Sequence, residues 1–265
     1  IHVLRCFDDD NITHVDESIN PVRDKETIDI ELQIKDLESV EKKIDTTKKK
    51  TRTGDKEAAK HLLILEKYKT HLESGQSARS IDLTDKEKEI VEDLMLLTDK
   101  PILYICNVNE DDANSGNAYV EAVKEAIKDE DAEMLVIAAG MEADIMELET
   151  FEERQEFLQD MGLAEPGVKK VIRTAYTLLK LQTYFTAGVK EVRAWTIKKG
   201  FTAPQAAGVI HTDFEKGFIR AEVIKYDDFV SLGSELACKE AGKLSVEGKE
   251  YIVQDGDIMH FRFNV

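Results

Sequence analysis

The residues best suited to bind a ligand follow two apolar runs. The run that starts at Ile102 ends in Asn107-Val108-Asn109-Glu110, and the run that starts at Met134 ends in Ala138-Ala139. Continuous apolar runs predict parallel strands covered on both faces, and ligand sites in such sheets lie just past the carboxyl ends of the strands. We therefore expect both segments to line one crevice, where amide and carboxylate groups can hydrogen-bond a ligand. Small alanines let backbone N–H groups come close to that ligand, although a tight turn from strand to helix needs the same small residues.

This pair of segments resembles the base-recognition half of a P-loop GTPase domain, where Asn-Lys-x-Asp is followed one helix and one strand later by Ser-Ala or a close variant. An aspartate in the fourth position accepts two hydrogen bonds from guanine, whereas adenine presents a donor and an acceptor there. Here Glu110 is one methylene longer and Val108 replaces the lysine, which predicts a weaker preference for guanine and an apolar side chain that packs on adenine. The combination resembles the Obg-like ATPase (YchF) family, known for binding ATP in a GTPase-type fold, over nearly the whole chain.

From this resemblance we expect the parent protein to be an ATPase that binds ATP, with GTP weaker, together with Mg²⁺. The base would be held by Asn107, Val108, Asn109, Glu110, Ala138 and Ala139. Neither the phosphate loop Gly-x-x-x-x-Gly-Lys-[Ser/Thr] nor the switch motif Asp-x-x-Gly occurs in the 265 residues. In the family both precede the strand that Ile1–Phe7 resembles, so we expect the N-terminal catalytic third to be absent. The chain is therefore predicted to carry the base-recognition half only, with no catalytic or metal-ligating residue, no tight nucleotide binding and no hydrolysis on its own.

Charge and cysteine content narrow the possible partners. The net charge of −18 argues against a protein that coats nucleic acid, so we expect no DNA partner. The three cysteines, Cys6, Cys106 and Cys238, are widely separated, and no segment resembles a signal peptide or is apolar for long enough to span a bilayer. We therefore expect a reduced, cytoplasmic setting and no membrane partner.

A helical hairpin is predicted for residues 25–75. Apolar residues recur at helical spacing in two stretches, around Ile34 and around Leu65, and Thr51–Asp55 is a plausible reversal between them. The family resemblance places a coiled-coil arm here. Basic residues crowd around the turn: Lys42, Lys43, Lys48, Lys49, Lys50, Arg52, Lys56 and Lys60. They indicate either a solvated helix end or a contact with phosphate backbone such as ribosomal RNA.

The flanking segments complete the first domain. Residues 12–24 form a polar connection that contains Pro21, and the Thr84–Glu87 capping box predicts one helix with Ile90, Leu94 and Leu97 facing inward. Further helices are predicted up to about residue 182, where alternating residues replace the helical pattern. We expect the C-terminal part of the nucleotide-binding domain at 1–24 and 76–182.

Residues 183–265 predict a small β-grasp domain. Polar and apolar residues alternate at 219–223 and 259–265, and one short helix is expected at 203–211. The segments 184–195, 211–220 and 253–263 resemble the TGS domain that ends YchF proteins. TGS domains are ubiquitin-like and are associated with RNA or regulatory interactions.

The fold class expected is therefore α/β. It combines an incomplete P-loop GTPase-type parallel sheet, an inserted antiparallel α-helical coiled-coil hairpin and a C-terminal β-grasp (ubiquitin-like) TGS domain. Two functions remain open. One is a nucleotide-binding ATPase that acts in association with the ribosome. The alternative is a non-catalytic RNA- or ribosome-interaction module that uses the basic arm and the TGS domain.

Overall fold

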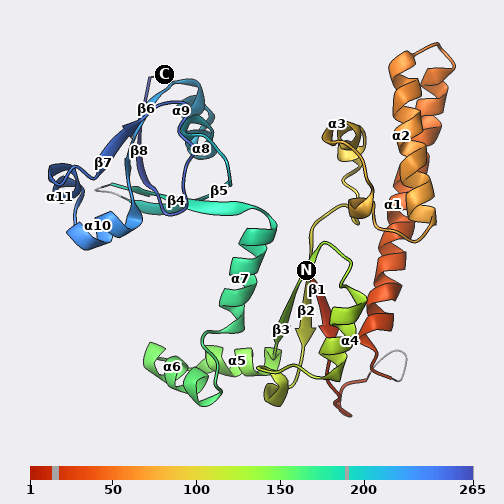
Figure 1. Ribbon diagram of the computed structural model, residues 1–265, viewed down its shortest axis with the longest axis horizontal. Helices are drawn as coiled ribbons and strands as arrows, with labels where there is room; N and C mark the ends of the chain where they lie inside the picture. The colour runs from red at the N-terminus through yellow and green to blue at the C-terminus, as the bar shows by residue number, and fades with distance from the viewer. Residues whose placement is uncertain (14–17, 189–190, 265) are drawn as a thin grey trace. The chain divides into compact units, whose positions relative to one another are not determined.

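A computed structural model of the chain describes residues 1–13, 18–188 and 191–264. The chain divides into two units, Ile1–Ile172 and Arg173–Val265. The first holds a parallel sheet and a pair of long helices, and the second holds a mixed sheet (Figure 1). This division falls within helix α7 (Gly167–Leu178), earlier than the domain boundary expected after residue 182.

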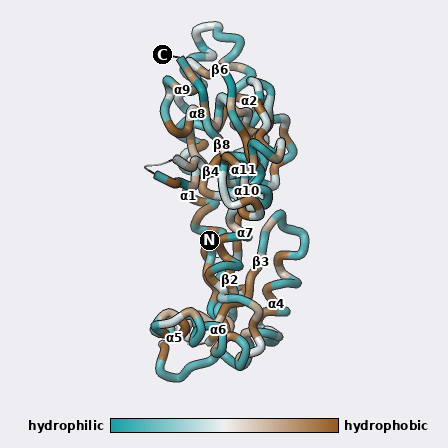
Figure 2. The backbone as a smooth tube through the Cα atoms, turned by 90° about the vertical axis from the view of Figure 1, so that its left-hand side faces the viewer, coloured by the Kyte–Doolittle hydropathy of each residue, from teal (hydrophilic) through white to brown (hydrophobic). Residues whose placement is uncertain are grey.

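The sheet of the first unit is parallel, as predicted. Its strands are β1 (His2–Arg5), β2 (Ile102–Asn107) and β3 (Ala132–Ile137), in the order β1-β2-β3. Helix α4 (Ala118–Ala126) connects β2 to β3 and buries Val120 and Val123 in the same apolar cluster as Leu4 and Cys106. The tube in Figure 2 is accordingly brown, the colour of hydrophobic residues, along β2 and β3.

Three helices follow β3: α5 (Ala139–Glu147), α6 (Phe151–Asp160) and α7. A capping box formed by Thr150 and Glu153 opens α6. The carboxylate of Glu142 in α5 accepts hydrogen bonds from the N–H of Gly167 at 2.6 Å and of Val168 at 3.3 Å. It thereby satisfies amide groups that the first turn of α7 leaves without a helical partner.

Two helices packed side by side form an arm, α1 (Pro21–Thr51) and α2 (Lys56–Glu73) (Figure 1). Helix α1 begins inside the connection expected at 12–24, because Asn20 caps it and Pro21 occupies its first turn. Residues 14–17 of that connection lie outside the described residues. The helices share a buried apolar core that includes Val40, Ile44, Ile64, Leu65, Tyr68 and Leu72.

The prediction of a single helix after Thr84 is wrong. The capping box is present, but α3 (Asp85–Lys88) is one turn long and passes into the 3-10 helix η2 (Glu89–Leu94), after the earlier turn η1 (Ala78–Ser80). Met95 then adopts a left-handed conformation with φ 48°. Leu97, expected to face inward, is 39% exposed. The buried carboxylate of Asp36 instead accepts hydrogen bonds from the N–H groups of Leu97 and Thr98, which draws this segment out of helical geometry.

The second unit is built on five strands, β4 (Leu181–Ala187), β5 (Val192–Lys198), β6 (Phe218–Ile224), β7 (Leu244–Glu247) and β8 (Ile258–Phe263). Their order is β5-β4-β8-β6-β7, with β4 and β8 parallel and the other pairs antiparallel. Helix α8 (Ala203–Ile210) packs Ala203, Ala206 and Ala207 into the core of this sheet. The shorter helices are α9 (Thr212–Lys216), α10 (Tyr226–Leu232) and α11 (Glu235–Glu240). Among the described residues of both units, no helix has the length and apolar character needed to cross a bilayer.

Candidate nucleotide site and basic arm

The two segments singled out in the sequence lie side by side. Asn107 and Ile137 end the paired strands β2 and β3 in register with each other. The N–H of Val108 continues the ladder by donating to the carbonyl of Ile137 at 3.0 Å. Ala138 is 2% exposed, and Ala139 is the first residue of α5. The polar loop after β2 and the first turn of α5 therefore meet at one edge of the sheet.

Asn107 joins these two segments. Its side-chain Oδ1 accepts a hydrogen bond from the N–H of Ala139 at 3.0 Å, and its main-chain carbonyl accepts one from the N–H of Cys6 at 2.8 Å. Its Nδ2 has no hydrogen-bond partner within the described residues, so two N–H donors remain for a ligand. The amide group of Asn107 is therefore held in place through its Oδ1, while its Nδ2 can donate hydrogen bonds to a ligand.

The residues after Asn107 divide into one buried and two exposed side chains. Val108 is 4% exposed and packs in the core of the first unit. Asn109 and Glu110 are exposed, and Glu110 begins the 3-10 helix η3 (Glu110–Asp112). Val108 thus supports the loop from the core side, and its expected contact with adenine stays a prediction. The carboxylate of Glu110 has no hydrogen-bond or ion-pair partner in the described part of the chain and can accept hydrogen bonds from a ligand.

Asn117 braces this loop, a role that the sequence did not reveal. Its Nδ2 donates to the carbonyl of Cys6 at 2.8 Å and to Oδ2 of Asp112 at 2.7 Å, while its Oδ1 caps α4. The asparagine was recognisable as a helix cap from its position. Its bond to Cys6 crosses 111 residues of sequence, so no local pattern could indicate it.

Two thiols lie beneath the site. Cys6 and Cys106 are both fully buried. Hydrogen bonding to Cys106 and the loss of solvent raise the pKa of the Cys6 thiol. Both residues therefore behave as core side chains that support the end of β2.

The donor set of the strand ends suits a planar base better than a metal–phosphate group. Amides, one carboxylate and backbone N–H groups can pair with the edge of a heterocycle, whereas Mg²⁺ prefers several oxygen ligands in octahedral geometry. Within residues 1–13, 18–188 and 191–264, no three His, Cys, Asp or Glu side chains are grouped so as to hold a metal ion.

The basic residues of the arm differ in how far they are already engaged. Lys43 donates to the carbonyl of Ile90 and pairs with Asp93, and Lys48 pairs with Glu66 at 3.5 Å. Five others form no ion pair with the described part of the chain: Lys42, Lys49, Lys50, Arg52 and Lys56. The uncompensated charge of the arm is therefore concentrated near the turn between α1 and α2.

Known proteins resemble the chain in both sequence and fold. The family model YchF-GTPase_C, described as a protein of unknown function (DUF933), matches residues 181–264. The ribosome-binding ATPase YchF of Pasteurella multocida is 54% identical over 264 residues, which cover 100% of this chain and 72% of that protein. Obg-like ATPase 1 of Rattus norvegicus is 45% identical over 99% of this chain and 67% of its own length. Among solved structures, that of the Schizosaccharomyces pombe YchF GTPase matches with a TM-score of 0.87 and 39% identity over 98% of this chain and 71% of that chain.

Proposed function

Since the chain belongs to the YchF family of Obg-like ATPases, we propose that it binds a purine nucleotide at the ends of β2 and β3, with ATP preferred over GTP. The observation that carries this proposal is the hydrogen bond from the N–H of Ala139 to Oδ1 of Asn107 at 3.0 Å. That bond holds the two segments together and orients the free Nδ2 donors of Asn107 toward the same edge.

The base preference follows from the loop after β2. Guanine offers two neighbouring N–H donors, which a short, fixed carboxylate can accept together, whereas adenine offers one amino group beside a ring nitrogen that accepts. Glu110 has a longer and more mobile side chain than the aspartate of the GTPase motif, so a single hydrogen bond from the adenine amino group suits it. The N–H groups in the first turn of α5 can donate to the ring nitrogen.

The phosphates and Mg²⁺ are proposed to interact with parts of the family fold other than the strand ends. In P-loop enzymes Mg²⁺ neutralises the charge that develops on the phosphates during transfer. The 265 residues contain no phosphate-loop sequence, so we propose that they recognise the base and do not hydrolyse ATP on their own.

The proposed setting is the cytoplasmic ribosome. The relative from P. multocida is named a ribosome-binding ATPase. The five cations of the arm that form no ion pair with the described residues offer an electrostatic contact for RNA phosphates. We assign the arm to the coiled-coil arm of the family, and the second unit to its ubiquitin-like β-grasp TGS domain. The match of the family model over residues 181–264 supports the second assignment.

A titration with both nucleotides tests the base preference. Ligand-detected NMR measures millimolar dissociation constants and therefore serves even for weak binding. We expect ATP to bind more tightly than GTP. Substituting Glu110→Asp should shift the ratio of the two constants about tenfold toward GTP, because a bidentate pair with a base discriminates by about 1–3 kcal/mol. The matched control is Glu121→Asp on the exposed side of α4, which should leave the ratio unchanged. Equal binding of ATP and GTP before and after Glu110→Asp would refute the proposal.

A second candidate is an interaction module that needs no nucleotide. It is favoured by the uncompensated charge near the arm's turn, which stands out in a chain of net charge −18. Co-sedimentation with ribosomes in the presence and absence of ATP distinguishes the two functions. A module predicts equal binding in both conditions, whereas a nucleotide-dependent factor predicts that ATP changes the bound fraction.

A further inference from the structure

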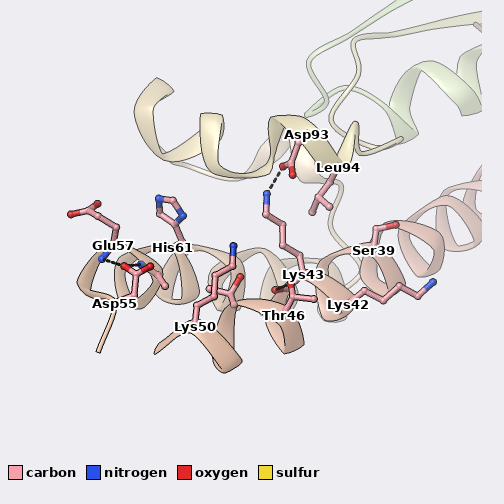
Figure 3. Close-up of a pocket in the computed structure, with 12 residues that line it drawn as sticks. Ser39, Lys42, Lys43, Thr46, Lys50, Asp55, Glu57, His61, Asp93 and Leu94 are labelled. Carbon is pink, nitrogen blue, oxygen red and sulfur yellow. Dashed lines mark hydrogen bonds and ion pairs between the residues drawn. The ribbon is translucent and has the colours of Figure 1, made fainter. Parts of the chain in front are cut away.

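A groove runs between the arm and the segment that contains η2. Its volume is about 680 Å³, and Figure 3 shows it in close-up. Hydroxyl and basic side chains of α1 form one wall, the first turns of α2 form the end, and Asp93 and Leu94 of η2 lie opposite. All of these residues belong to the first unit.

Three nitrogen-bearing side chains share the side of the arm that faces η2. In Figure 3, Lys43 and Lys50 rise from α1 and His61 from α2 toward that segment, while the amine of Lys42 lies away from them. The side chains of Lys50 and His61 have no hydrogen-bond or ion-pair partner among the described residues. The groove therefore holds donors that the folded chain does not use.

The carboxylates at the α2 end of the groove are already engaged. Asp55 accepts hydrogen bonds from the N–H groups of Glu57 and Ala58 at 3.0 Å and so caps α2. Glu57 pairs with Lys60 at 2.8 Å. Neither carboxylate neutralises Lys50 or His61.

Among the described residues that line the groove, Asp93 is the one carboxylate that reaches the basic side chains from the opposite wall. It pairs with Lys43, whose side chain is 21% exposed, whereas the side chain of Asp93 is 70% exposed. An exposed carboxylate held on a half-buried lysine is easily displaced, because surface ion pairs contribute little net free energy. Asp93 thus occupies the position that an external anion would take.

We propose that this groove binds a backbone phosphate of RNA through Lys43, Lys50 and His61, and that Asp93 is an internal competitor for Lys43. The inference rests on the proposed association with the ribosome and specifies where the arm makes its contact. A phosphodiester accepts hydrogen bonds only, and the free groups of the groove donate them. On binding, the phosphate takes Lys43 from Asp93 and loosens the contact between the arm and η2.

Removing the competitor should strengthen binding, which a merely structural role for Asp93 would not do. The assay is fluorescence anisotropy with a labelled single-stranded RNA, and every variant is first checked for an unchanged urea midpoint. We expect Asp93→Asn to tighten binding about fivefold at low salt, the size expected for freeing one charged contact. The matched control is Glu92→Gln, which removes the same charge from the neighbouring exposed residue and should change affinity less than about twofold.

Removing a donor should have the opposite effect. Lys50→Gln is expected to weaken binding about tenfold and to reduce the slope of log affinity against log salt by about 0.7, the value for one phosphate contact on a single strand. Lys69→Gln serves as its control, because Lys69 already pairs with Glu41 at 2.6 Å.

The outcomes separate this inference from the function on which it rests. Equal effects of Asp93→Asn and Glu92→Gln on RNA affinity would mean that only the total charge matters. That result would refute the proposal that Asp93 competes with phosphate for Lys43. Ribosome binding by the parent chain with no effect of Lys50→Gln would overturn the groove and leave the proposed function intact. Binding of inorganic phosphate without any binding of RNA would identify a small-anion site instead. A parent chain that binds neither ribosomes nor RNA would overturn both.

Discussion

The ends of β2 and β3 and the basic side of the arm are both built from polar residues, but different forces position them. At the strand ends the register of a parallel sheet brings Asn107 to Ala139, and main-chain hydrogen bonds from Cys6 and Val108 fix the loop. On the arm the positions are set by long side chains on exposed helices. A sequence motif therefore predicts the geometry of the first region well, whereas a list of lysines predicts only the total charge of the second.

Asp36 connects these two regions. It lies on α1, is 2% exposed, and accepts hydrogen bonds at 2.7 Å from the N–H of Leu97 and from both the N–H and the hydroxyl of Thr98. Thr98 in turn accepts the N–H of Ala78 at 2.9 Å. The chain enters β2 four residues later, at Ile102. Asp36 thus connects the arm to the segment that leads into β2, the strand that ends in Asn107.

Removing the hydrogen bonds of Asp36 should have the largest effect on stability that we expect. Asp36→Ala leaves buried N–H groups without acceptors, each of which costs about 1–3 kcal/mol, so the free energy of unfolding should fall by about 3 kcal/mol. Urea denaturation measures the change. Asp45→Ala removes an exposed carboxylate from the same helix and should change stability by less than about 0.5 kcal/mol. Similar losses for both variants would mean that the arm responds to charge rather than to this connection.

Substitutions of Asn107 test the first region of this comparison, the ends of β2 and β3. Asn107→Ala removes both the acceptor for Ala139 and the free donors, and should weaken ATP binding about tenfold, since one hydrogen bond contributes about 1 kcal/mol and the loop also loses its support. Asn107→Asp keeps an oxygen for Ala139 and loses the Nδ2 donors. It should therefore retain the stability of the parent chain while losing affinity. If both variants bind ATP as the parent does, the strand ends are not the base site.

Much of the strand-end site could be predicted from the sequence, because its pattern is local. Apolar runs located both strands, and parallel geometry required their carboxyl ends to share an edge. The burial of Val108 could also be predicted, because Tyr104, Cys106 and Val108 alternate on one face of the strand. All three are buried. Burial of Val108 in the core of the first unit leaves its contact with adenine a prediction.

The arm was less predictable because its contacts are distant in sequence. Lys43 pairs with Asp93, 50 residues away, and Asp36 binds Thr98, 62 residues away. Neither contact leaves a periodic signal. The incorrect helix at 84–97 has the same origin, since a capping box and helical spacing are local features. The hydrogen bonds from the N–H groups of Leu97 and Thr98 to Asp36 outweigh these local preferences for a helix.

The smallest expected effect concerns a buried polar group of the arm that, unlike Asp36, has no partner. Within the described residues the hydroxyl of Tyr68 is the buried side-chain polar atom without a hydrogen bond. Burial, reinforced by Asp99 and Glu87, raises the pKa of Tyr68 to about 12. Tyr68→Phe removes an unsatisfied hydroxyl and keeps the ring, so near neutral pH the free energy of unfolding should stay equal or rise by about 0.5 kcal/mol.

The pH dependence of the same variant isolates this hydroxyl. An unfolded tyrosine ionises near pH 10, whereas Tyr68 in the folded chain keeps its proton up to about pH 12. Its contribution to stability is therefore complete below pH 10 and is lost as the pH rises from 10 through 12. Tyr68→Phe lacks that loss, so its advantage over the parent chain should grow between urea titrations at pH 8 and pH 10.5. Burial also raises the pKa of Tyr104 and Tyr184, but both residues are present in the two proteins and cancel in the difference. A variant less stable than the parent by 1 kcal/mol or more at pH 8 would mean that the hydroxyl is satisfied, for instance by a bound water, and that the arm's core tolerates buried polar groups only when they are paired.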